Sequence, residues 1–381
     1  MQIELSEEQV LLRDNVRRFA EEVVKPNAKE IDETGVFPRG YYDQAGELGL
    51  AGVCVPEAYG GAGMDTASYC LIIEEISRVC ATSGVILSVN NSLVCDPILK
   101  WGNEEQKQKY LKPLASGKQL GCFGLTEPGA GSDAAGLSST ARRDSDGYIL
   151  NGNKVFITNG TDADLALVFA SVDLAKKHKG ITAFLVPADT PGYSHGTHEF
   201  KLGVNASGTT ELAFTDMRVH ASQRLGEEGE GFKIAMSTLD GGRIGISAQA
   251  VGIARGAFEE ALAYAQQRKQ FGSALSEFQA IQFYLADMAT EIDAARLLTW
   301  KAAWSKDTQK RYTLEAAQAK LYSSEMAQRV TNKALQIHGG YGYTKEYNVE
   351  RYFRDARITE IYEGTSEIQK MVIADWVLKS A

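Results

Sequence analysis

The chain has few prolines, cysteines and histidines, and it has no excess of positive charge. Among its 381 residues are 8 prolines, 5 cysteines and 5 histidines, and 49 acidic against 40 basic residues give a formal charge of -9. An acidic chain has no broad positive field that would gather phosphates, so we expect no nucleic-acid partner. No apolar run approaches the roughly 20 residues of a membrane span, and the start, MQIELSEEQV, is acidic. We therefore expect a cytoplasmic protein without a targeting segment or membrane insertion.

The cysteines argue against two common kinds of stabilising site. Their number is odd, and none of Cys54, Cys70, Cys80, Cys95 and Cys122 stands in CxxC spacing. We therefore expect neither disulfides nor a metal site. A composition of 44% hydrophobic and 23% charged residues is typical of globular proteins, and the length favours two or three domains of about 150 residues each.

The spacing of apolar residues changes twice along the chain. Ser6 and Gln9 form a capping box before an apolar helical face, and helical spacing continues to about residue 115. From Leu120 to about Leu225, short β-branched runs alternate with turn residues and have no helices between them, which predicts an antiparallel sheet or small barrel. Helical spacing returns at Gly231. The expected fold is α+β multidomain, with an α-helical domain over 1–117, a central antiparallel β domain over 118–228 and an α-helical domain over 229–381.

A glycine-rich loop, CFGLTEPGAGSD, occupies residues 122–133. Its backbone N–H groups can approach an anionic or ring-shaped ligand closely, although a simple glycine-rich turn would have the same composition. Gly129, Gly131 and Ala134 also match the GxGxxA spacing of dinucleotide-binding folds. We reject that interpretation because the residues that follow, AAGLSSTARR, do not open a helix and the region lacks alternating strands and helices.

Two further pairs of side chains have spacings that suit a ligand. Phe156 and Thr158 are two residues apart in VFITNG, so on a strand they would share one face, where they could stack on a flat ring and bond its edge. The alternative is an ordinary core aromatic. Asp240 and Arg243 lie one helical turn apart, and the alternative for them is an i,i+3 ion pair on a helix surface.

Two segments of the C-terminal third combine glycine with aromatic or basic residues. Arg268 and Phe271, in RKQFG, offer a bidentate phosphate donor beside an aromatic ring, or simply a solvated helix end. The segment IHGGYGY, from Ile337, is a glycine-rich break between helices, where close approach to a ligand competes with a plain helix cap.

Glu363 differs from most of the acidic residues in its surroundings. The apolar pair Ile361–Tyr362 precedes it and Gly364 follows it. A carboxylate in an apolar, water-poor site has a raised pKa and can act as a base near neutral pH. The helix after it is expected to begin with a capping box made by Ser366 and Gln369.

Together these segments resemble the acyl-CoA dehydrogenases, and most closely the short-chain, butyryl-type members. The matching motifs are LTEPGAGSD, VFITNG, LDGGRIGISAQAVGIA, RKQFG, IHGGYGY and RDARITEIYEGTSEIQ, which stand in the family's order along the whole chain. The resemblance implies an N-terminal helical domain, a central β domain and a C-terminal four-helix bundle, assembled as a homotetramer. It also implies a flavoprotein oxidoreductase of fatty acid β-oxidation that binds FAD and passes electrons to an electron-transferring flavoprotein.

The resemblance also implies a role for individual residues. Glu363 matches the catalytic base, and the adenosine end of FAD is expected to meet residues contributed across a dimer interface. The residues expected to contact FAD are Phe123, Leu125, Thr126, Gly131, Ser132, Phe156, Thr158, Arg268, Phe271, Gln279, Gln336, Gly339, Gly340, Thr365 and Glu367. The residues expected to contact acyl-CoA are Ser132, Asp240, Arg243 and Gly364.

The implied reaction removes two hydrogens from the acyl chain of a thioester. Hydrogen bonds from the flavin ribityl hydroxyl and from the backbone N–H of Glu363 stabilise the developing enolate. Glu363 removes the α-proton while the β-hydride passes to the flavin, which gives a trans-2-enoyl-CoA. In isovaleryl-type relatives the base occupies the position before the substrate arginine. That position is Gly242 here, so we expect Glu363 to be the base.

The acyl group is expected to be short and linear. In this family the segment that reads Ser83–Val94 here lines part of the acyl pocket, and it contains no Lys or Arg that could pair with a second carboxylate. A glutaryl-type substrate is therefore disfavoured, because a buried unpaired charge is costly. Short branched or alicyclic acyl-CoAs stay open, because one or two methylenes change binding by only ~1–3 kcal/mol.

Two other functions stay open for the same scaffold. Acyl-CoA oxidases usually carry a further C-terminal domain, and we expect none here because the sequence closes at Ala381 soon after the last expected helix. A non-catalytic acyl-CoA binding scaffold would keep the fold without the flavin, so the purified protein would be colourless rather than yellow.

Overall fold

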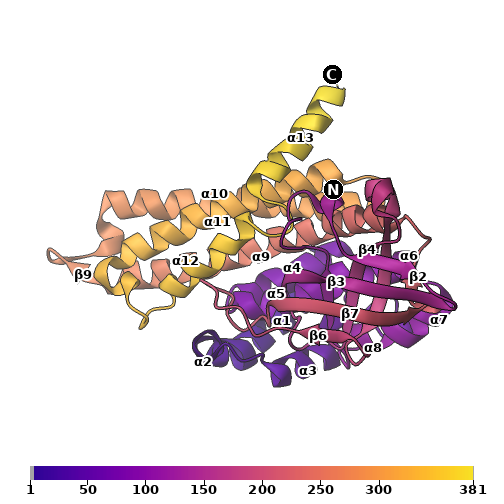
Figure 1. Cartoon of the computed structure of the whole chain (residues 1–381). Coiled ribbons are helices and arrows are strands. Elements are labelled where there is room, and N and C mark those ends of the chain that lie inside the picture. Colours follow the sequence, from indigo (N-terminus) through magenta and orange to yellow (C-terminus); the bar gives the residue numbers. More distant parts are fainter. Residues whose placement is uncertain (1–3, 381) are drawn as a thin grey trace.

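Helices form the N-terminal part of the protein. The computed structural model describes residues 4–380, and in Figure 1 its first, indigo helices lie at the lower edge of the molecule. The predicted capping box is confirmed, because Gln9 N donates to Ser6 Oγ at 3.2 Å and Ser6 N donates to Gln9 Oε1 at 3.1 Å. These helices are α1 (Glu7–Phe19), α2 (Ala28–Thr34), α3 (Arg39–Glu47), α4 (Thr66–Ser77), α5 (Ala81–Ser88), α6 (Asp96–Trp101), α7 (Glu104–Gln106) and α8 (Lys112–Ala115).

An eight-stranded sheet follows in the middle of the chain. Its order is β6-β7-β3-β2-β4-β5-β8, and β1 pairs with β4 off that path. Most pairs are antiparallel, as expected, but β1 and β2 both pair in parallel with β4. The strands are β1 (Gly121–Gly124), β2 (Thr140–Arg143), β3 (Gly147–Ile157), β4 (Leu165–Ser171), β5 (Ile181–Pro187), β6 (Tyr193–His195), β7 (Thr210–His220) and β8 (Arg224–Leu225).

The two parallel pairs explain where the glycine-rich loop lies. Residues 121–124 pair with residues 165–168 of β4, and Thr140 pairs with Ser171 further along the same strand. Residues 125–139 therefore connect two strands that both pair with β4. This connection contains only one short helical turn, Ala134–Gly136. A dinucleotide-binding βαβ unit needs a full helix at this point. Its rejection from the sequence is confirmed.

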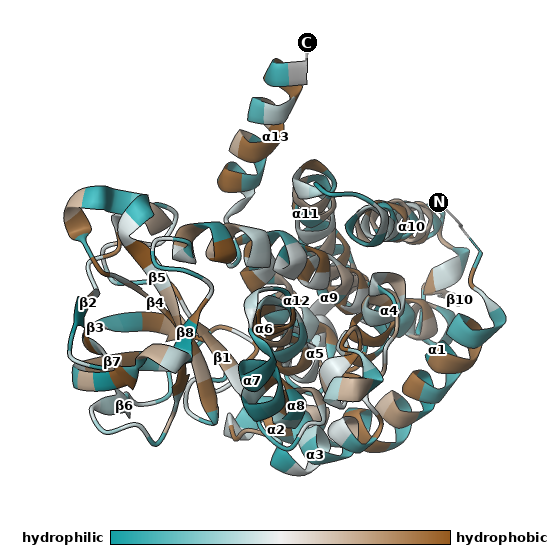
Figure 2. Cartoon of the chain, turned by 90° about the vertical axis from the view of Figure 1, so that its right-hand side faces the viewer, coloured by the Kyte–Doolittle hydropathy of each residue, from teal (hydrophilic) through white to brown (hydrophobic). Residues whose placement is uncertain are grey.

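Long helices form the C-terminal part. The helices α9 (Gly231–Gln267), α10 (Gln279–Thr308) and α11 (Thr313–His338) pack against one another, and α12 (Val349–Arg357) packs on α9 and α11. A hairpin of β9 (Lys269–Gln270) and β10 (Ser273–Ala274) joins α9 to α10. The last helix, α13 (Ser366–Ser380), projects away from the body (Figures 1 and 2). The expected helical C-terminal region is confirmed, with α12 rather than α13 completing the packed group inside this chain.

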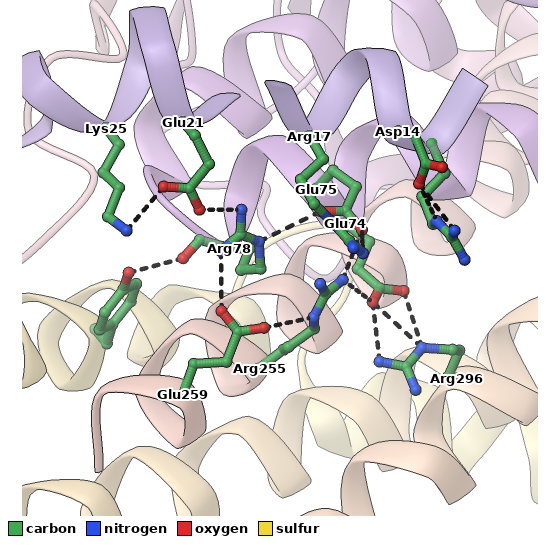
Figure 3. Close-up of polar contacts among 12 residues, drawn as sticks. Asp14, Arg17, Glu21, Lys25, Glu74, Glu75, Arg78, Arg255, Glu259 and Arg296 are labelled. Carbon is green, nitrogen blue, oxygen red and sulfur yellow. Dashed lines mark hydrogen bonds and ion pairs between the residues drawn. The ribbon is translucent and has the colours of Figure 1, made fainter. Parts of the chain in front are cut away.

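Helix α9 also joins the two helical parts of the chain. Its Gly252 lies so close to α4 that a Cβ there would stand 2.4 Å from Glu74 O. Beside this crossing, carboxylates and guanidinium groups from α1 and the helical segment after it, the end of α4, α9 and α10 form what we call the arginine–glutamate cluster (Figure 3). Its members are Arg17, Glu21, Glu74, Glu75, Arg78, Arg255, Glu259 and Arg296.

Within residues 4–380, no helix is long and apolar enough to cross a membrane, and no group of three or more His, Cys, Asp or Glu could hold a metal ion. All five cysteines are free thiols.

Candidate active site

Glu363 lies in a tight turn between α12 and α13. Its φ of +53° is in the left-handed region, and Gly364 follows with a φ of +92°. Such a conformation is costly for a residue with a side chain, so the surrounding contacts must hold it in place. The oxygen Oε2 of Glu363 is buried and has no hydrogen-bond partner among the residues that the structure describes. A buried carboxylate oxygen without a donor is rare in proteins and marks a site that a ligand completes.

The surroundings of Glu363 make its carboxyl group basic. Burial raises its pKa to about 8, although the charges of Lys320 and Arg243 act in the opposite direction. Loss of hydration disfavours the ionised form of a carboxyl group, and no donor replaces the lost water at Oε2. A carboxyl group with a pKa near neutrality can accept a proton in one step of a reaction and release it in another.

Gly242 provides the space for this carboxylate. A Cβ at Gly242 would stand 2.0 Å from Glu363 Oε2 and 2.7 Å from Leu93 Cδ2. Any side chain here would displace Glu363, so a base at position 242 and a base at position 363 would compete for one volume. Glycine at position 242 therefore has two effects: it provides no alternative base, and it leaves room for the carboxylate of Glu363.

Arg243 and Asp240 link α9 to the Glu363 turn. Arg243 Nη1 donates to Asp240 Oδ1 at 2.8 Å, and Arg243 Nε donates to the carbonyl of Glu363 at 3.4 Å. Thr313 Oγ1 donates to the other carboxylate oxygen of Asp240 at 2.6 Å. Only 6% of Arg243 is exposed. The alternative of an i,i+3 pair on a helix surface is therefore wrong, because α11 and the turn cover this face of α9.

An apolar surface lies next to the same turn. Val85, Val89 and Leu93 form a buried cluster against which Phe123 and Tyr362 pack. The three aliphatic residues are four apart, so they lie on one face of the helical segment that begins with α5. Tyr362 is held from behind by a hydrogen bond from its hydroxyl to Gln249 Oε1. The stretch Ser83–Val94 thus contributes an apolar wall beside Glu363.

The glycine-rich loop is anchored by a buried ion pair. Lys154 Nζ lies 2.6 Å from Glu127 Oε1, and neither side chain is exposed by more than 2%. Glu127 also accepts hydrogen bonds from the backbone N–H groups of Ser138 and Ser139, at 2.6 and 3.0 Å. Burial opposes ionisation of Glu127, but these bonds and the charge of Lys154 outweigh it and lower its pKa to about 2. The pair fixes both ends of the loop.

Phe156 does not follow the strand pattern expected for it. Its φ is +58°, the register between β3 and β7 shifts between Lys154 and Ile157, and β3 ends at Ile157. The prediction that Phe156 and Thr158 share a strand face is therefore wrong, because a bulge interrupts the alternation of side chains. The bulge leaves 69% of Phe156 exposed. It follows Val155, whose N–H bonds to the carbonyl of Thr126 in the loop at 2.9 Å.

A cavity of about 510 Å³ lies at the other end of α9. The predicted residues Arg268, Gly339 and Gly340 line it, and His338 stacks on Tyr264 in its wall with ring centres 4.2 Å apart. Three other predicted residues lie outside its lining and are exposed. Phe271 stands between β9 and β10, Gln279 begins α10 and Gln336 is near the end of α11.

Comparisons with known proteins agree along the whole chain. The N-terminal, middle and C-terminal domains of acyl-CoA dehydrogenases match residues 6–118, 122–217 and 229–378. The chain belongs to the acyl-CoA dehydrogenase family. The mitochondrial short-chain specific acyl-CoA dehydrogenase of Bos taurus is 53% identical over 378 residues, which cover 99% of this chain and 92% of the relative.

Two solved structures match this acyl-CoA dehydrogenase closely. Butyryl-CoA dehydrogenase from Megasphaera elsdenii has a TM-score of 0.97 and 48% identity, with coverage of 99% of this chain and 100% of that one. A chain in a structure described as the electron transferring flavoprotein of Acidaminococcus fermentans has a TM-score of 0.98 and 49% identity, with full coverage of both chains.

The residues of this chain fit FAD, the cofactor of the family. Around the positions where Gly129 and Gly131 would carry a Cβ, no atom lies within 4 Å, so the loop backbone is open to a ligand. Of the other predicted residues there, Ser132 is exposed at the loop, Phe123 is partly buried, and Leu125 is buried in the core below the sheet. The open backbone and the exposed ring of Phe156 suit the flat flavin ring.

The start of α13 is built differently from the prediction. Ser366 is the first residue of the helix, and Thr365 Oγ1 instead accepts from the N–H of Ile368 at 3.4 Å. Gln369 turns back and donates to the carbonyls of Glu363 and Gly364, at 3.2 and 2.8 Å. The predicted capping box is therefore wrong, because Gln369 holds the Glu363 turn. The remaining predicted residue, Glu367, is exposed in the first turn of α13.

Three residues near the site were not predicted from the sequence. Lys154 and Glu127 are far apart along the chain, and only the pairing of the loop with β3 brings them together. Lys320 donates from Nζ to the carbonyl of Gly364 at 2.8 Å, although the sequence of this segment indicates only a helix. A lysine within an otherwise Ala-rich helical face could have indicated a buried polar contact.

Proposed function

We propose that Glu363 is the catalytic base of this acyl-CoA dehydrogenase and that the substrate is a short-chain acyl-CoA, which is converted to the trans-2-enoyl-CoA. One observation carries the proposal: a buried carboxylate oxygen without a partner stands against the glycine at the alternative base position. The apolar wall of Val85, Val89 and Leu93 beside it suits an acyl chain.

Different residues of the chain have different roles in the proposed reaction. Bound FAD would accept the hydride from the β-carbon. Glu363 takes the α-proton, and its backbone N–H donates to the thioester carbonyl, where negative charge develops. The bonds from Arg243 and Gln369 to the turn keep the carboxylate and this N–H in a fixed relation. The apolar wall excludes water, which keeps the carboxyl group basic.

The shape of α9 supports a short acyl group. Three residues after Gly242, a Cβ at Gly245 would stand 2.3 Å from the hydroxyl of Tyr69 and 2.5 Å from Ser88 Oγ. These two hydroxyls bond each other at 2.9 Å and lie against α9 about one turn after Gly242, which leaves no room for a side chain there. Ser132, Asp240, Arg243 and Gly364 are proposed to contact the acyl-CoA, as the family resemblance implies.

We infer that FAD is held between two copies of the chain. The Glu363 site contacts α9 at Arg243. The 510 Å³ cavity lies at the other end of this helix, at Arg268, which directly follows its last residue. Twenty-five helical residues rise about 37 Å, more than one FAD can span. The loop of one copy and Arg268, Gly339 and Gly340 of another would together complete each site.

A homotetramer fits the surface of the C-terminal helices. Large apolar side chains are exposed on α10 and α13, which is typical of a surface that another copy covers. They include Phe283 and Leu297 on α10 and Met371, Val377 and Leu378 on α13. Sedimentation equilibrium of the FAD-bound protein would give a mass four times that of one chain, and a monomer mass would contradict both the tetramer and the shared FAD site.

Two further properties of the enzyme are proposed. Its electron acceptor is an electron-transferring flavoprotein, which is supported by the close match to a chain in the Acidaminococcus fermentans structure. Its location is cytoplasmic, since five free thiols suit a reducing compartment.

The decisive experiment is an anaerobic titration of the FAD-bound protein with butyryl-CoA, followed by the flavin absorbance. Wild type should bleach, and Glu363→Gln should keep its flavin but bleach about a hundredfold to ten-thousandfold more slowly, because general base catalysis contributes about that much. Glu325→Gln is the matched control, since Glu325 is a partly exposed carboxylate paired with Lys370 at 3.1 Å.

Each other outcome has a definite meaning. If Glu363→Gln bleaches as fast as wild type, Glu363 is not the base. If wild type bleaches with a branched or alicyclic acyl-CoA but not with butyryl-CoA, the proposed substrate is wrong and the base assignment stands. If air reoxidises the bleached flavin as fast as an added electron-transferring flavoprotein does, the enzyme is an oxidase.

A further inference from the structure

Lys320 is a buried lysine that the proposed reaction does not use. Its side chain is 0% exposed, in the first half of α11, and its Nζ donates to the carbonyl of Gly364 at 2.8 Å. In the part of the chain that the structure describes, no carboxylate oxygen lies within 4 Å of this nitrogen. Removing an ammonium group from water is expensive, so an unpaired buried lysine beside a reactive carboxylate calls for an explanation.

The carbonyl that Lys320 holds belongs to the strained turn. Glu363 and Gly364 both have positive φ. Gln369 Nε2 donates to the same carbonyl of Gly364 at 2.8 Å, and Arg243 Nε donates to the neighbouring carbonyl of Glu363 at 3.4 Å. Side chains from α11, α13 and α9 therefore converge on two consecutive peptide groups.

Lys320 and Arg243 differ in how their charge acts on Glu363. Arg243 forms a 2.8 Å ion pair with Asp240, which offsets its positive charge. Lys320 has only a carbonyl as its close partner, so no ion pair offsets the charge of its ammonium form toward the nearby carboxylate. Burial outweighs the charge of Glu363 and lowers the pKa of Lys320 to about 8, while the charge of the ammonium form in turn lowers the pKa of Glu363.

We propose that Lys320 is a positioning residue for the base: its ammonium group holds the Glu363–Gly364 turn and favours the ionised, proton-accepting form of Glu363. The inference rests on the proposed role of Glu363. The charged or titratable groups that bear on this pair are Arg243 and Asp240 on α9, Tyr69 on α4, Tyr362 beside the base, and Glu360 and Glu367 flanking the turn.

The test separates the charge of Lys320 from its hydrogen bond. Lys320→Met removes both, Lys320→Gln removes the charge but keeps a donor for the Gly364 carbonyl, and Gln369→Met removes the other donor to that carbonyl without changing the charge. Lys333→Met is the matched control, because Lys333 lies on the same helix, is partly exposed and pairs with Asp287 at 3.0 Å, away from the Glu363 turn. All are studied as FAD-bound protein with butyryl-CoA.

The expected result is a shift in pH dependence. In both Lys320 variants the acid limb of kcat/KM should move upward by about one pH unit, because a nearby opposite charge lowers a carboxyl pKa by about that much or more. At pH values below the limb this is about a tenfold loss. Gln369→Met should lower kcat without moving the limb, and Lys333→Met should change neither. The infrared band of the protonated Glu363 carboxyl group can be identified because it is absent in Glu363→Gln. The pH at which this band disappears should move upward together with the acid limb.

Three results would overturn the inference. The first is an unmoved limb and infrared band in Lys320 variants that retain FAD. The second is a shift of the same size in Gln369→Met, which would make the hydrogen bond rather than the charge responsible. The third is loss of FAD from both Lys320→Met and Lys320→Gln, which would show that Lys320 only supports the fold. If Glu363→Gln is fully active, the proposed base fails instead, and that outcome is visible independently.

Discussion

Two regions of this enzyme remove glutamates from water, and they do so to opposite effect. In the arginine–glutamate cluster, Glu75 on α4 is buried. Both of its carboxylate oxygens accept hydrogen bonds from arginines, namely Arg17 on α1, Arg78 at the end of α4 and Arg255 on α9 (Figure 3). At the candidate active site, Glu363 has a buried oxygen with no partner in the described residues. Burial raises the pKa of both carboxyl groups, so the difference between their pKa values comes from the hydrogen-bond donors and charges around them.

The pKa values of the two carboxyl groups show the size of that difference. Burial would raise the pKa of Glu75, but hydrogen bonds and charges from Arg17 and Arg255 outweigh it and lower the pKa to about 2. Burial of Glu363 is only partly offset by Lys320 and Arg243, and its pKa rises to about 8. A fully paired carboxylate stays charged and joins helices, whereas an under-paired one can exchange a proton at neutral pH.

The largest effect on stability is expected from the paired carboxylate. Glu75→Gln would leave the guanidinium groups of Arg17, Arg78 and Arg255 around a neutral side chain. Removing one partner of a buried ion pair costs about 3–5 kcal/mol when the other charge is left without compensation. The cost here is expected at the lower end of that range, because Arg78 and Arg255 keep Glu21, Glu74 and Glu259 as partners. Urea denaturation of the FAD-bound protein at pH 7 should show this loss.

The matched control is an exposed pair on α13. Lys379 Nζ lies 2.7 Å from Asp375 Oδ2, with both side chains more than half exposed. Asp375→Asn should cost at most about 0.5 kcal/mol, as is usual for i,i+4 pairs in water. If Glu75→Gln costs no more than Asp375→Asn, the cluster does not hold the helices together.

The two carboxylates should also respond to pH in opposite directions. The folded-state pKa of Glu75 is below its usual value of 4.5, so its contribution to stability is complete above pH 4.5 and is lost as the pH falls toward 2. The cost of Glu75→Gln should therefore shrink in acid. An unchanged cost between pH 5 and 3 would contradict the lowered pKa.

The smaller pH effect belongs to Glu363. Its folded-state pKa is above 4.5, so its neutral form favours the folded protein at low pH, and that contribution is lost as the pH rises through about 8. Glu363→Gln should match wild type near pH 5 and exceed its stability at pH 9 by on the order of 2 kcal/mol, less than the whole shift because the residue is only half-buried. Equal pH dependence of the two proteins would exclude a raised pKa.

Local signals in the sequence predicted much of the fold. The capping box at Ser6, the change from helical spacing to short strands near Leu120, and the return to helices at Gly231 depend on neighbouring residues, and the structure confirms each of them. The glycine-rich loop was likewise recognisable, because glycine and proline limit the backbone locally. Its position along one edge of β4 depended on parallel pairs that no local pattern indicated.

The sequence was less informative where distant segments meet. The bulge at Phe156 arises from a register shift against β7, and the Ser366 box fails because Gln369 bonds to the Glu363 turn. Lys320 and Glu363 are 43 residues apart and come from different helices and turns, so spacing along the chain could not relate them.

The order of helical and β segments, the loop and the candidate base could be predicted from the chain alone, because these follow from local backbone preferences and short motifs. Which charges face one another depends on how distant segments pack in space. This packing placed Arg17 and Arg255 on Glu75, and it placed Gly242 and an unshared Lys320 beside Glu363. Hydration and Coulomb interactions depend on distances in space, so the same side chain becomes a structural anion in one place and a proton acceptor in the other.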